Sequence, residues 1–317
     1  MFDFSLYDPS LPVTAATRRR HWFSILGLTL CVGLVAWGGF VTSIDAGLAV
    51  PDWPTSFGSY DPIATGYVDE ADPAARWWHY VPILAEHGHR LFGAILGLWV
   101  LAFAVWTWRV DVRHRMRNLG FAALGLVTLQ GILGGLRVVW KSADLAVVHA
   151  MGAQFLFALL LAMTLFTAPS WLRGVSIRQP TRKLRSLSVA TAVAICVQIL
   201  LGAILRHPGA GVHLGFATIH IAGALLVVGL ILATCAEVRS EHGSDRVVNR
   251  TAWVMMGAVG LQVTLGFVAL AVLLVESRLG ERSMLQIVLN SAHLVVGTLL
   301  FGASVCLMLF LARRADP

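Results

Sequence analysis

Charged residues are scarce in this sequence. Aspartate, glutamate, lysine and arginine make up 13% of its 317 residues, about half of the ~25% found in soluble proteins. Hydrophobic residues make up 57%, against ~45–50% in soluble proteins, and the mean hydropathy is +0.75. This composition excludes an intrinsically disordered chain, which needs low hydrophobicity, and it excludes an ordinary water-soluble fold.

Cysteine is also rare. The four cysteines, Cys31, Cys196, Cys235 and Cys306, all lie inside apolar stretches, where a thiol behaves as a small apolar side chain. We therefore predict no structural disulfide.

Acidic residues are fewer than basic ones, which gives a formal net charge of +7. The basic residues stand in short runs between apolar stretches, where they set the orientation of a membrane protein. Nucleic-acid binding is therefore excluded, and the partner that the sequence predicts is the lipid bilayer.

Eight apolar stretches of about 20 residues, the length that crosses a ~30 Å hydrocarbon core, predict an all-α membrane protein. Charged residues or proline and glycine clusters bound each stretch. The predicted spans are Trp22–Thr42, Ile83–Trp108, Leu119–Leu136, Leu145–Ala168, Leu187–Leu205, Val212–Ala236, Ala252–Val275 and Leu285–Ala312.

The distribution of basic residues predicts the orientation. If the N-terminus is cytoplasmic, most basic residues fall on the cytoplasmic side, in accordance with the positive-inside rule. The exceptions are Arg76, Arg90, Arg137, Lys141, Arg206, Arg278 and Arg282. An odd number of spans would not place most of the basic residues on one side of the membrane. We therefore predict eight spans in the cell (inner or plasma) membrane, with both termini in the cytoplasm.

The spans contain an internal repeat. In three copies, one span carries glutamine followed by leucine and glycine, and the next span carries histidine near its outer end. These copies are Gln130 with His149, Gln198 with His220, and Gln262 with His293. The first two spans form a divergent copy, in which WGGFVTS leads through a long loop to His89.

The repeat predicts two tandem four-helix bundles with the same orientation, related by a pseudo-two-fold axis along the membrane normal. Residues 1–168 would form the N-terminal half and residues 187–317 the C-terminal half. The segment 169–186, which is rich in arginine and contains Pro180, is the predicted cytoplasmic linker.

Each half offers two histidines at equivalent places. An ionisable side chain within the hydrocarbon region is costly, so such histidines are functional candidates. Two histidines that face each other across a bundle can supply both axial ligands of a haem iron. Four in register favour one haem per half over interhelical hydrogen bonding by neutral imidazoles. Zinc fits less well, because tetrahedral sites need three or four protein ligands.

Glycines and arginines accompany these histidines. Glycines follow them by three or four residues and share nearly the same helix face; they are Gly93, Gly152, Gly223 and Gly297. They either leave room for a flat macrocycle or allow close helix packing. Arg90, Arg137 and Arg206 lie at outer helix ends, where each could meet a haem propionate.

The other histidines receive weaker predictions. His87 points about 200° away from His89 around a helix, so we expect an interfacial or supporting residue. The histidines of arginine-rich cytoplasmic segments are predicted to be solvated; they are His21, His114 and His242. Depth argues against ligation by those in or near outer loops, which are His79, His207 and His213.

The run AGLAVPDWPTSFGSY, from Ala46 to Tyr60, together with EHGHR, from Glu86 to Arg90, resembles the haem A synthase family of integral membrane enzymes. The resemblance extends over nearly the whole chain. It implies the conversion of haem O to haem A by oxidation of a porphyrin methyl group to a formyl group, for use in terminal oxidases. It also implies a b-type haem as a second cofactor, haem O supplied by a haem O synthase, and an electron donor that the sequence does not identify.

The resemblance also implies roles for individual residues. Glu86, His89 and Arg90 match the family's Glu-x-x-His-Arg motif, and His149 matches its partner, so this pair would bind the iron of the substrate haem. Glu86 would be the catalytic residue near the oxidised methyl group. The pair that would bind haem b is matched by His220 and His293. The loop motif is matched by Asp52 and Trp53, for which a structural role is as well supported as a chemical one.

Some features depart from the family or leave alternatives open. Some members carry cysteine pairs in outer loops, and this sequence has none there. The acidic outer segment 59–82 is either a lid or a solvated loop. The runner-up function is a di-haem b-type membrane electron-transfer cytochrome, although such proteins commonly place their haems at different depths. A transporter with histidine proton relays is a third interpretation, but no glycine- or proline-broken helices are paired between the halves.

Overall fold

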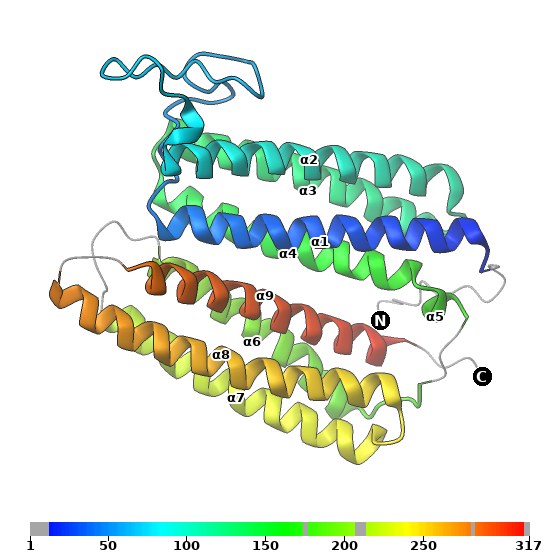
Figure 1. Ribbon diagram of the computed structural model, residues 1–317. Helices are drawn as coiled ribbons and strands as arrows, with labels where there is room; N and C mark the ends of the chain where they lie inside the picture. The colour runs from blue at the N-terminus through cyan, green and yellow to red at the C-terminus, as the bar shows by residue number, and fades with distance from the viewer. Residues whose placement is uncertain (1–12, 174–176, 207–213, 280–282, 314–317) are drawn as a thin grey trace.

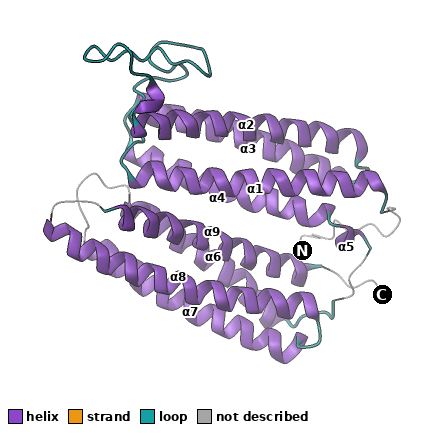
Figure 2. Ribbon diagram, in the orientation of Figure 1, coloured by secondary structure: helices purple, strands orange, loops and turns teal. Residues whose placement is uncertain are grey.

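The computed structural model describes residues 13–173, 177–206, 214–279 and 283–313. Apart from one isolated bridge between Ser56 and Ser59, all regular secondary structure in these ranges is helical (Figure 2). Eight of the described helices are long and apolar enough to cross a membrane. The prediction of an all-α, multi-pass membrane protein with eight spans is therefore confirmed.

The eight long helices run in both directions through the bundle. They are α1 (Ala15–Ser43), α2 (Val81–Val110), α3 (His114–Val139), α4 (Ala143–Thr167), α6 (Arg182–Arg206), α7 (Leu214–His242), α8 (Arg246–Leu279) and α9 (Met284–Ala312). The short helices are η1 (Trp77–His79) and α5 (Pro169–Leu172). Figure 1 shows α1 beginning and α9 ending at the same end of the bundle, which we call the inner end. That the inner end faces the cytoplasm stays a prediction.

Local sequence signals set the helix ends. Thr14 caps α1 by accepting a hydrogen bond from the backbone N–H of Thr17 at 3.3 Å. Pro82 lies in the first turn of α2, where its missing N–H costs nothing. Helices extend past the predicted spans, as in α1, which begins at Ala15 rather than at Trp22. The reason is that polar residues continue a helix beyond the hydrocarbon core that hydropathy detects.

Each half of the bundle is a ring of four helices. In the first half, α1 contacts α2, α2 contacts α3, α3 contacts α4, and α4 closes the ring against α1. Helices α6, α7, α8 and α9 repeat this pattern. The contacts agree with two tandem four-helix bundles. Within each ring, the two helices that carry the candidate histidines, α2 with α4 and α7 with α9, are diagonal partners.

The two rings pack together through α1, α4, α6 and α9 (Figure 1). Helix α9 is central, because 56% of its apolar window is buried, against 11% in α7 and in α8. Gln154 of α4 donates a hydrogen bond to Thr298 of α9 at 3.1 Å, and Leu294 of α9 packs against Gly39 of α1. The division of the chain into domains at residues 168 and 186 stays a prediction.

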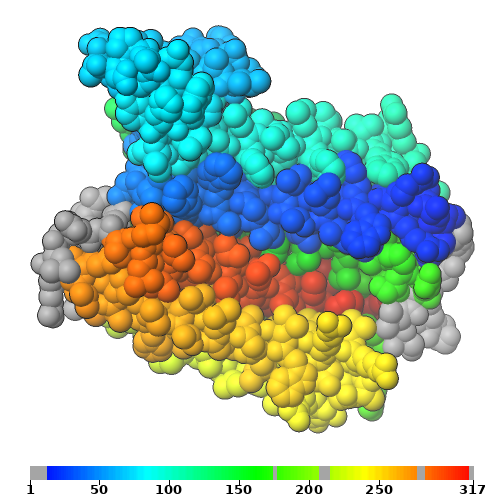
Figure 3. Space-filling model, viewed as in Figure 1, coloured from blue at the N-terminus to red at the C-terminus, as the bar shows by residue number. Residues whose placement is uncertain are grey.

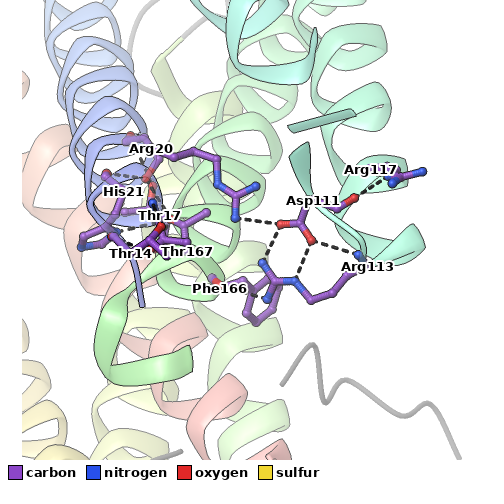
Figure 4. A network of polar contacts seen from close by, with 11 residues as sticks. Thr14, Thr17, Arg20, His21, Asp111, Arg113, Arg117, Phe166 and Thr167 are labelled. Carbon is purple, nitrogen blue, oxygen red and sulfur yellow. Dashed lines mark hydrogen bonds and ion pairs between the residues drawn. The ribbon is translucent and has the colours of Figure 1, made fainter. Parts of the chain in front are cut away.

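Asp111, between α2 and α3, joins three helices at the inner end (Figure 4). Its carboxylate pairs with Arg20 of α1 at 2.9 Å and with Arg113 at 2.8 Å. Arg113 in turn donates to the backbone carbonyl of Phe166 in α4 at 3.1 Å. Burial of Asp111 favours its neutral form, but the hydrogen bonds and charge of Arg113 and the charge of Arg20 outweigh burial and hold its pKa below the ordinary value.

Asp111→Asn is expected to lower the free energy of unfolding at pH 7 by about 3 kcal/mol, because it leaves buried guanidinium groups without their carboxylate. A carboxylate with a depressed pKa stabilises the fold above its unfolded pKa of about 4, and this contribution is lost as the pH falls through the lower folded pKa. Wild-type protein should therefore lose stability below about pH 4, and Asp111→Asn should lose less. Thermal unfolding in detergent, followed by circular dichroism, measures both effects. Asp144→Asn, at an exposed position in the first turn of α4, is the control, and equal melting of Asp111→Asn and wild type at pH 7 would contradict the prediction.

The predicted linker packs against the inner end. Trp171 of α5 is 2% exposed, and its ring centroid lies 5.2 Å from that of Phe166 and 6.0 Å from that of Phe310. The guanidinium of Arg313 lies 4.9 Å over the same ring. The linker is thus partly buried against both halves of the bundle.

The prediction that His242 is solvated is wrong. His242 is fully buried, and its Nδ1 lies 2.6 Å from the Asp245 carboxylate, because the chain turns directly from α7 back into α8 there. His21 is half-buried, with Nδ1 3.3 Å from the hydroxyl of Thr167, whereas His114 is exposed as predicted. The predictions for His207 and His213 fall outside the described residues.

Candidate functional site

The loop between α1 and α2 lies at the outer end of the first half (Figure 1). Arg90 of α2 fastens this loop through its two terminal nitrogens. It donates to the backbone carbonyls of Val50 at 3.0 Å, Asp52 at 2.8 Å and Thr55 at 3.2 Å. The two motifs that are separate in the sequence therefore form one structural unit.

Glu86 belongs to the same unit. The residue is 4% exposed, and its Oε1 accepts a hydrogen bond from Arg90 at 2.8 Å. Its Oε2 accepts from the backbone N–H of Val50 at 2.8 Å. The ion pair with Arg90 that the helical spacing allows is thus formed. These contacts do not test a catalytic role for Glu86, which stays a prediction.

Asp52 and Trp53 shape and dock the loop. The Asp52 carboxylate accepts hydrogen bonds from the Thr55 hydroxyl and from the backbone N–H of Gly58 at 2.9 Å. Partial burial acts to raise the pKa of Asp52, but the hydrogen bonds it accepts outweigh burial and lower that pKa. The Trp53 indole lies against Gly135 of α3, where a Cβ would come within 2.2 Å of the ring. Both residues therefore have a structural function in the loop.

His87 fastens a later part of the loop. It is 3% exposed, with Nδ1 3.1 Å from the hydroxyl of Ser56 and Nε2 3.1 Å from the carbonyl of Pro62. Its ring makes a T-shaped contact with Trp77 at 4.8 Å. His87 is thus a supporting residue, as its direction away from His89 on the helix predicts.

The acidic segment that follows projects from the helices as an exposed loop (Figure 3). Asp61 accepts a hydrogen bond from the backbone N–H of Ile63 at 2.8 Å, and Asp69 accepts one from the hydroxyl of Tyr80. The bond to Asp69 raises the pKa of Tyr80 above its ordinary value. Because these carboxylates satisfy groups of the loop itself, the solvated-loop interpretation is favoured over a lid.

The four candidate histidines occupy equivalent places in the two rings. They are His89, His149, His220 and His293, near the outer ends of α2, α4, α7 and α9. In every copy the imidazole lies against a glycine of the preceding long helix, and a Cβ on that glycine would be 3.0–3.2 Å from Cε1 of the ring. These glycines are Gly38, Gly134, Gly202 and Gly266. Sequence reasoning missed this contact, although a glycine follows each repeat glutamine by four residues.

The histidines of each half come from diagonal helices. The ring centroids of His220 and His293 are 6.5 Å apart. When two imidazoles bind the same metal ion from opposite sides, each at about 2 Å, their ring centroids are roughly 6 Å apart. The His220–His293 pair therefore has the spacing for one shared iron. His89 of α2 and His149 of α4 are the corresponding pair of the first half. No group of three or more His, Cys, Asp or Glu side chains suited to a metal ion is found among the described residues.

In three of the four copies, the glycine that follows the histidine allows close helix packing, which is one of its two predicted roles. A Cβ on Gly152, Gly223 or Gly297 would meet the side chain of a repeat glutamine at 2.0, 2.3 or 3.1 Å. These positions therefore serve close packing against the glutamine side chains. A Cβ on Gly93, in the divergent copy, would meet no described atom within 4 Å.

Two arginines lie beside the histidine pairs. Arg137 stands three residues after Gly134, which lies against His149, and Arg206 stands four residues after Gly202, which lies against His220. Each pair thus has a cation near it, which can attract an anionic group of a ligand. Arg90 uses both terminal nitrogens in the loop, whereas Arg137 donates to the loop carbonyl of Gly47 through one of them, at 3.2 Å.

A model of the COX15-CtaA family, described as cytochrome oxidase assembly protein, matches residues 21–220. The match begins in α1 and ends at the histidine of α7. It includes the loop between α1 and α2 together with Glu86, His89, Arg90, His149 and His220.

The chain is also similar to several bacterial proteins named heme A synthase. The protein from Symbiobacterium thermophilum is 29% identical over 251 residues, which are 70% of this chain and 76% of that relative. The protein from Lysinibacillus sphaericus is 26% identical over 195 residues, and one from Exiguobacterium sp. is 29% identical over 194 residues. These two matches cover 60% and 59% of this chain and span 59% and 57% of the relatives' own length.

Proposed function

This chain belongs to the COX15-CtaA family of cytochrome oxidase assembly proteins, and on that premise we propose that it is a haem A synthase. The proposed activity is the oxidation of a methyl group of haem O to a formyl group, which gives haem A. The observation that carries the proposal is the pair of histidines on diagonal helices in each half. This arrangement is the one that holds a haem between two axial imidazoles in a helical bundle.

Each half would hold one haem. His89 and His149 would bind the iron of haem O, the substrate, and His220 and His293 would bind a resident haem b. Support comes from the 6.5 Å spacing of the second pair and from the glycine contact that all four rings share. Arg90, Arg137 and Arg206 are cations near the two pairs that could neutralise propionates.

Haem iron supplies the oxidation chemistry, which no amino-acid side chain provides. The chain contributes position, charge and shelter from water. The loop that Arg90 and Trp53 fasten at the outer end would restrict the access of water to the first site. The lipid-facing helices would leave the long apolar tail of haem O within the bilayer.

Glu86 is the residue that we assign to proton exchange near the oxidised methyl group. Protonation of Oε1 would weaken its ion pair with Arg90 and could release that arginine from the carboxylate. Such a release leaves Arg90 in place, because the three backbone carbonyls of Val50, Asp52 and Thr55 still hold it. The buried carboxylate could therefore change its protonation state without loss of the loop.

The surroundings of the enzyme follow from the same proposal. Haem O would be handed over by a haem O synthase, and an electron donor, not identified, would take part in the redox cycle. The arginine-rich inner end supports a location in the cell (inner or plasma) membrane with both termini in the cytoplasm.

Acid extraction and chromatography of the bound haems test the proposed function. The protein is purified from cells with and without co-expressed haem O synthase. We expect haem A together with haem b in the first sample and haem b without haem A in the second. A haem-loaded protein that never converts haem O would overturn the proposal in favour of a di-haem b-type electron-transfer cytochrome. A protein without a haem absorption band would favour a transporter instead.

A further inference from the structure

Three of the four candidate histidines have a glutamine beside them. Gln198 Nε2 donates to the backbone carbonyl of His220 at 2.7 Å and lies 3.1 Å from its ring Nδ1. Gln262 Nε2 lies 3.1 Å from the ring Nε2 of His293. The glutamine side chains thus reach the imidazoles of the second half directly.

In the first half, Gln130 takes the corresponding place beside His149. Its amide would lie 2.0 Å from a Cβ on Gly152, and Gly152 is one helical turn after His149. Gln130 is 7% exposed, and neither its Nε2 nor its Oε1 has a hydrogen-bond partner. A buried amide without partners is costly, so a hydrogen bond to this side chain would be stabilising.

Some glutamine and histidine side-chain atoms in these pairs have no hydrogen-bond partner. The amide oxygens of Gln130 and Gln262 have no partner, and neither do the ring Nδ1 atoms of His149 and His293. A histidine that binds a metal through one ring nitrogen usually donates a hydrogen bond from the other, which fixes the ring and raises its basicity. In His220 the glutamine amide reaches Nδ1, and in His293 it reaches Nε2, so each amide lies against one of the two ring nitrogens.

The divergent copy has no such glutamine. Leu34 stands four residues before Gly38, where the other copies have glutamine four residues before their glycine. Leu34 packs into the apolar core, and among the described residues no atom lies within 4 Å of the Cβ position on Gly93. The ring Nδ1 of His89 also has no partner. His89 is therefore the one candidate histidine whose repeat carries leucine in place of the glutamine.

We infer that Gln130, Gln198 and Gln262 are positioning residues for the three imidazoles beside them, and that the absence of a fourth glutamine makes the first site the exchangeable one. This inference rests on the proposed function. The second site, with a glutamine on both sides, retains its haem. The first site, in which His89 has no such glutamine, admits the substrate and releases the product.

The first test removes a glutamine from the second site. Gln262→Leu should speed the loss of haem b to an excess of apomyoglobin by about 10- to 100-fold, the usual effect of removing such a partner. Gln262→Leu should also raise the reduction potential of that haem, whereas Gln262→Glu, which accepts the ring hydrogen bond more strongly, should lower it. Shifts of opposite sign would not follow from a purely structural role. The matched control is Gln154→Leu, because Gln154 is a buried helical glutamine that bonds Thr298 and no histidine.

The second test adds a glutamine to the first site. Leu34→Gln should slow the loss of haem A from the first half by about tenfold, and it should lower the steady-state rate of haem A release without preventing the first turnover. Leu34→Gln adds a glutamine beside His89 and removes none of the existing glutamine contacts. It therefore tests the inference even if the Gln262 variants fold poorly.

The outcomes separate the inference from the proposed function. Haem loss from Gln262→Leu equal to that from Gln154→Leu, or potential shifts of the same sign in Gln262→Leu and Gln262→Glu, would overturn the positioning role even if haem A is formed. Unchanged haem A release from Leu34→Gln would overturn the exchange role. A wild-type protein that binds two haems but forms no haem A would instead overturn the proposed function. The dissociation rates of its bound haems would still measure the positioning effect.

Discussion

His220→Ala and His293→Ala are each expected to remove one of two bound haems and to lower haem A formation by more than about 100-fold. The reason is that each variant deletes an axial ligand, and loss of even a supporting partner of a ligand costs about 10- to 100-fold in metal affinity. The haem of the first half should remain, because its ligands come from α2 and α4. Haem-to-protein ratios from pyridine haemochrome spectra, with haem A quantified after acid extraction, measure both effects.

The corresponding variants of the first half should behave differently. His89→Ala and His149→Ala should keep haem b and its reduction potential but bind no haem O or haem A. His114→Ala, at an exposed position at the inner end, is the control and should retain both haems. Loss of both haems from every histidine variant would point to a general folding defect, and retention of both by all of them would show that these residues are not ligands.

Glu86→Gln is expected to reduce haem A formation by about 100- to 10,000-fold, the contribution that a positioned general acid or base makes. Both haems should remain bound, because no candidate ligand is changed. The neutral amide can keep one acceptor oxygen for the backbone N–H of Val50, but it cannot exchange a proton at neutral pH. Chromatography of extracted haems should show haem O, or a partly oxidised product, accumulating in place of haem A.

The contacts of Glu86 require a control for the loop. Because Glu86 also fastens Val50 and Arg90, Asp52→Asn serves as a variant that weakens the same loop away from the buried carboxylate. A loss of activity that is similar in Asp52→Asn and Glu86→Gln would assign Glu86 a positioning role. Normal haem A yield from Glu86→Gln would refute any role in catalysis.

The sequence predicts the membrane fold well, because the bilayer imposes a simple length and hydropathy on each span. Where the structure describes them, all eight spans form helices, but α1 begins at Ala15 and α8 at Arg246, well before the apolar runs at Trp22 and Ala252. Hydropathy marks where lipid surrounds a helix, and it does not mark where the helix stops. The burial of His242 is a similar case, since its neighbours in the sequence are polar and its surroundings come from a turn between two helices.

The candidate site is predictable where it repeats. The four histidines and the three glutamines stand in register along the sequence, so their place near one end of the bundle follows from spacing. The contacts between elements do not. No sequence pattern predicts the hydrogen bonds from Arg90 to three loop carbonyls or the packing of Trp53 against Gly135. Both depend on how the loop folds back over α2 and α3.

The most direct test of the account is an experimental density map of the protein purified with bound haem. The account predicts two irons near the outer end, one between His89 and His149 and one between His220 and His293, each at about 2 Å from an imidazole nitrogen on either side. Irons at different depths, or histidine side chains turned toward lipid, would contradict it.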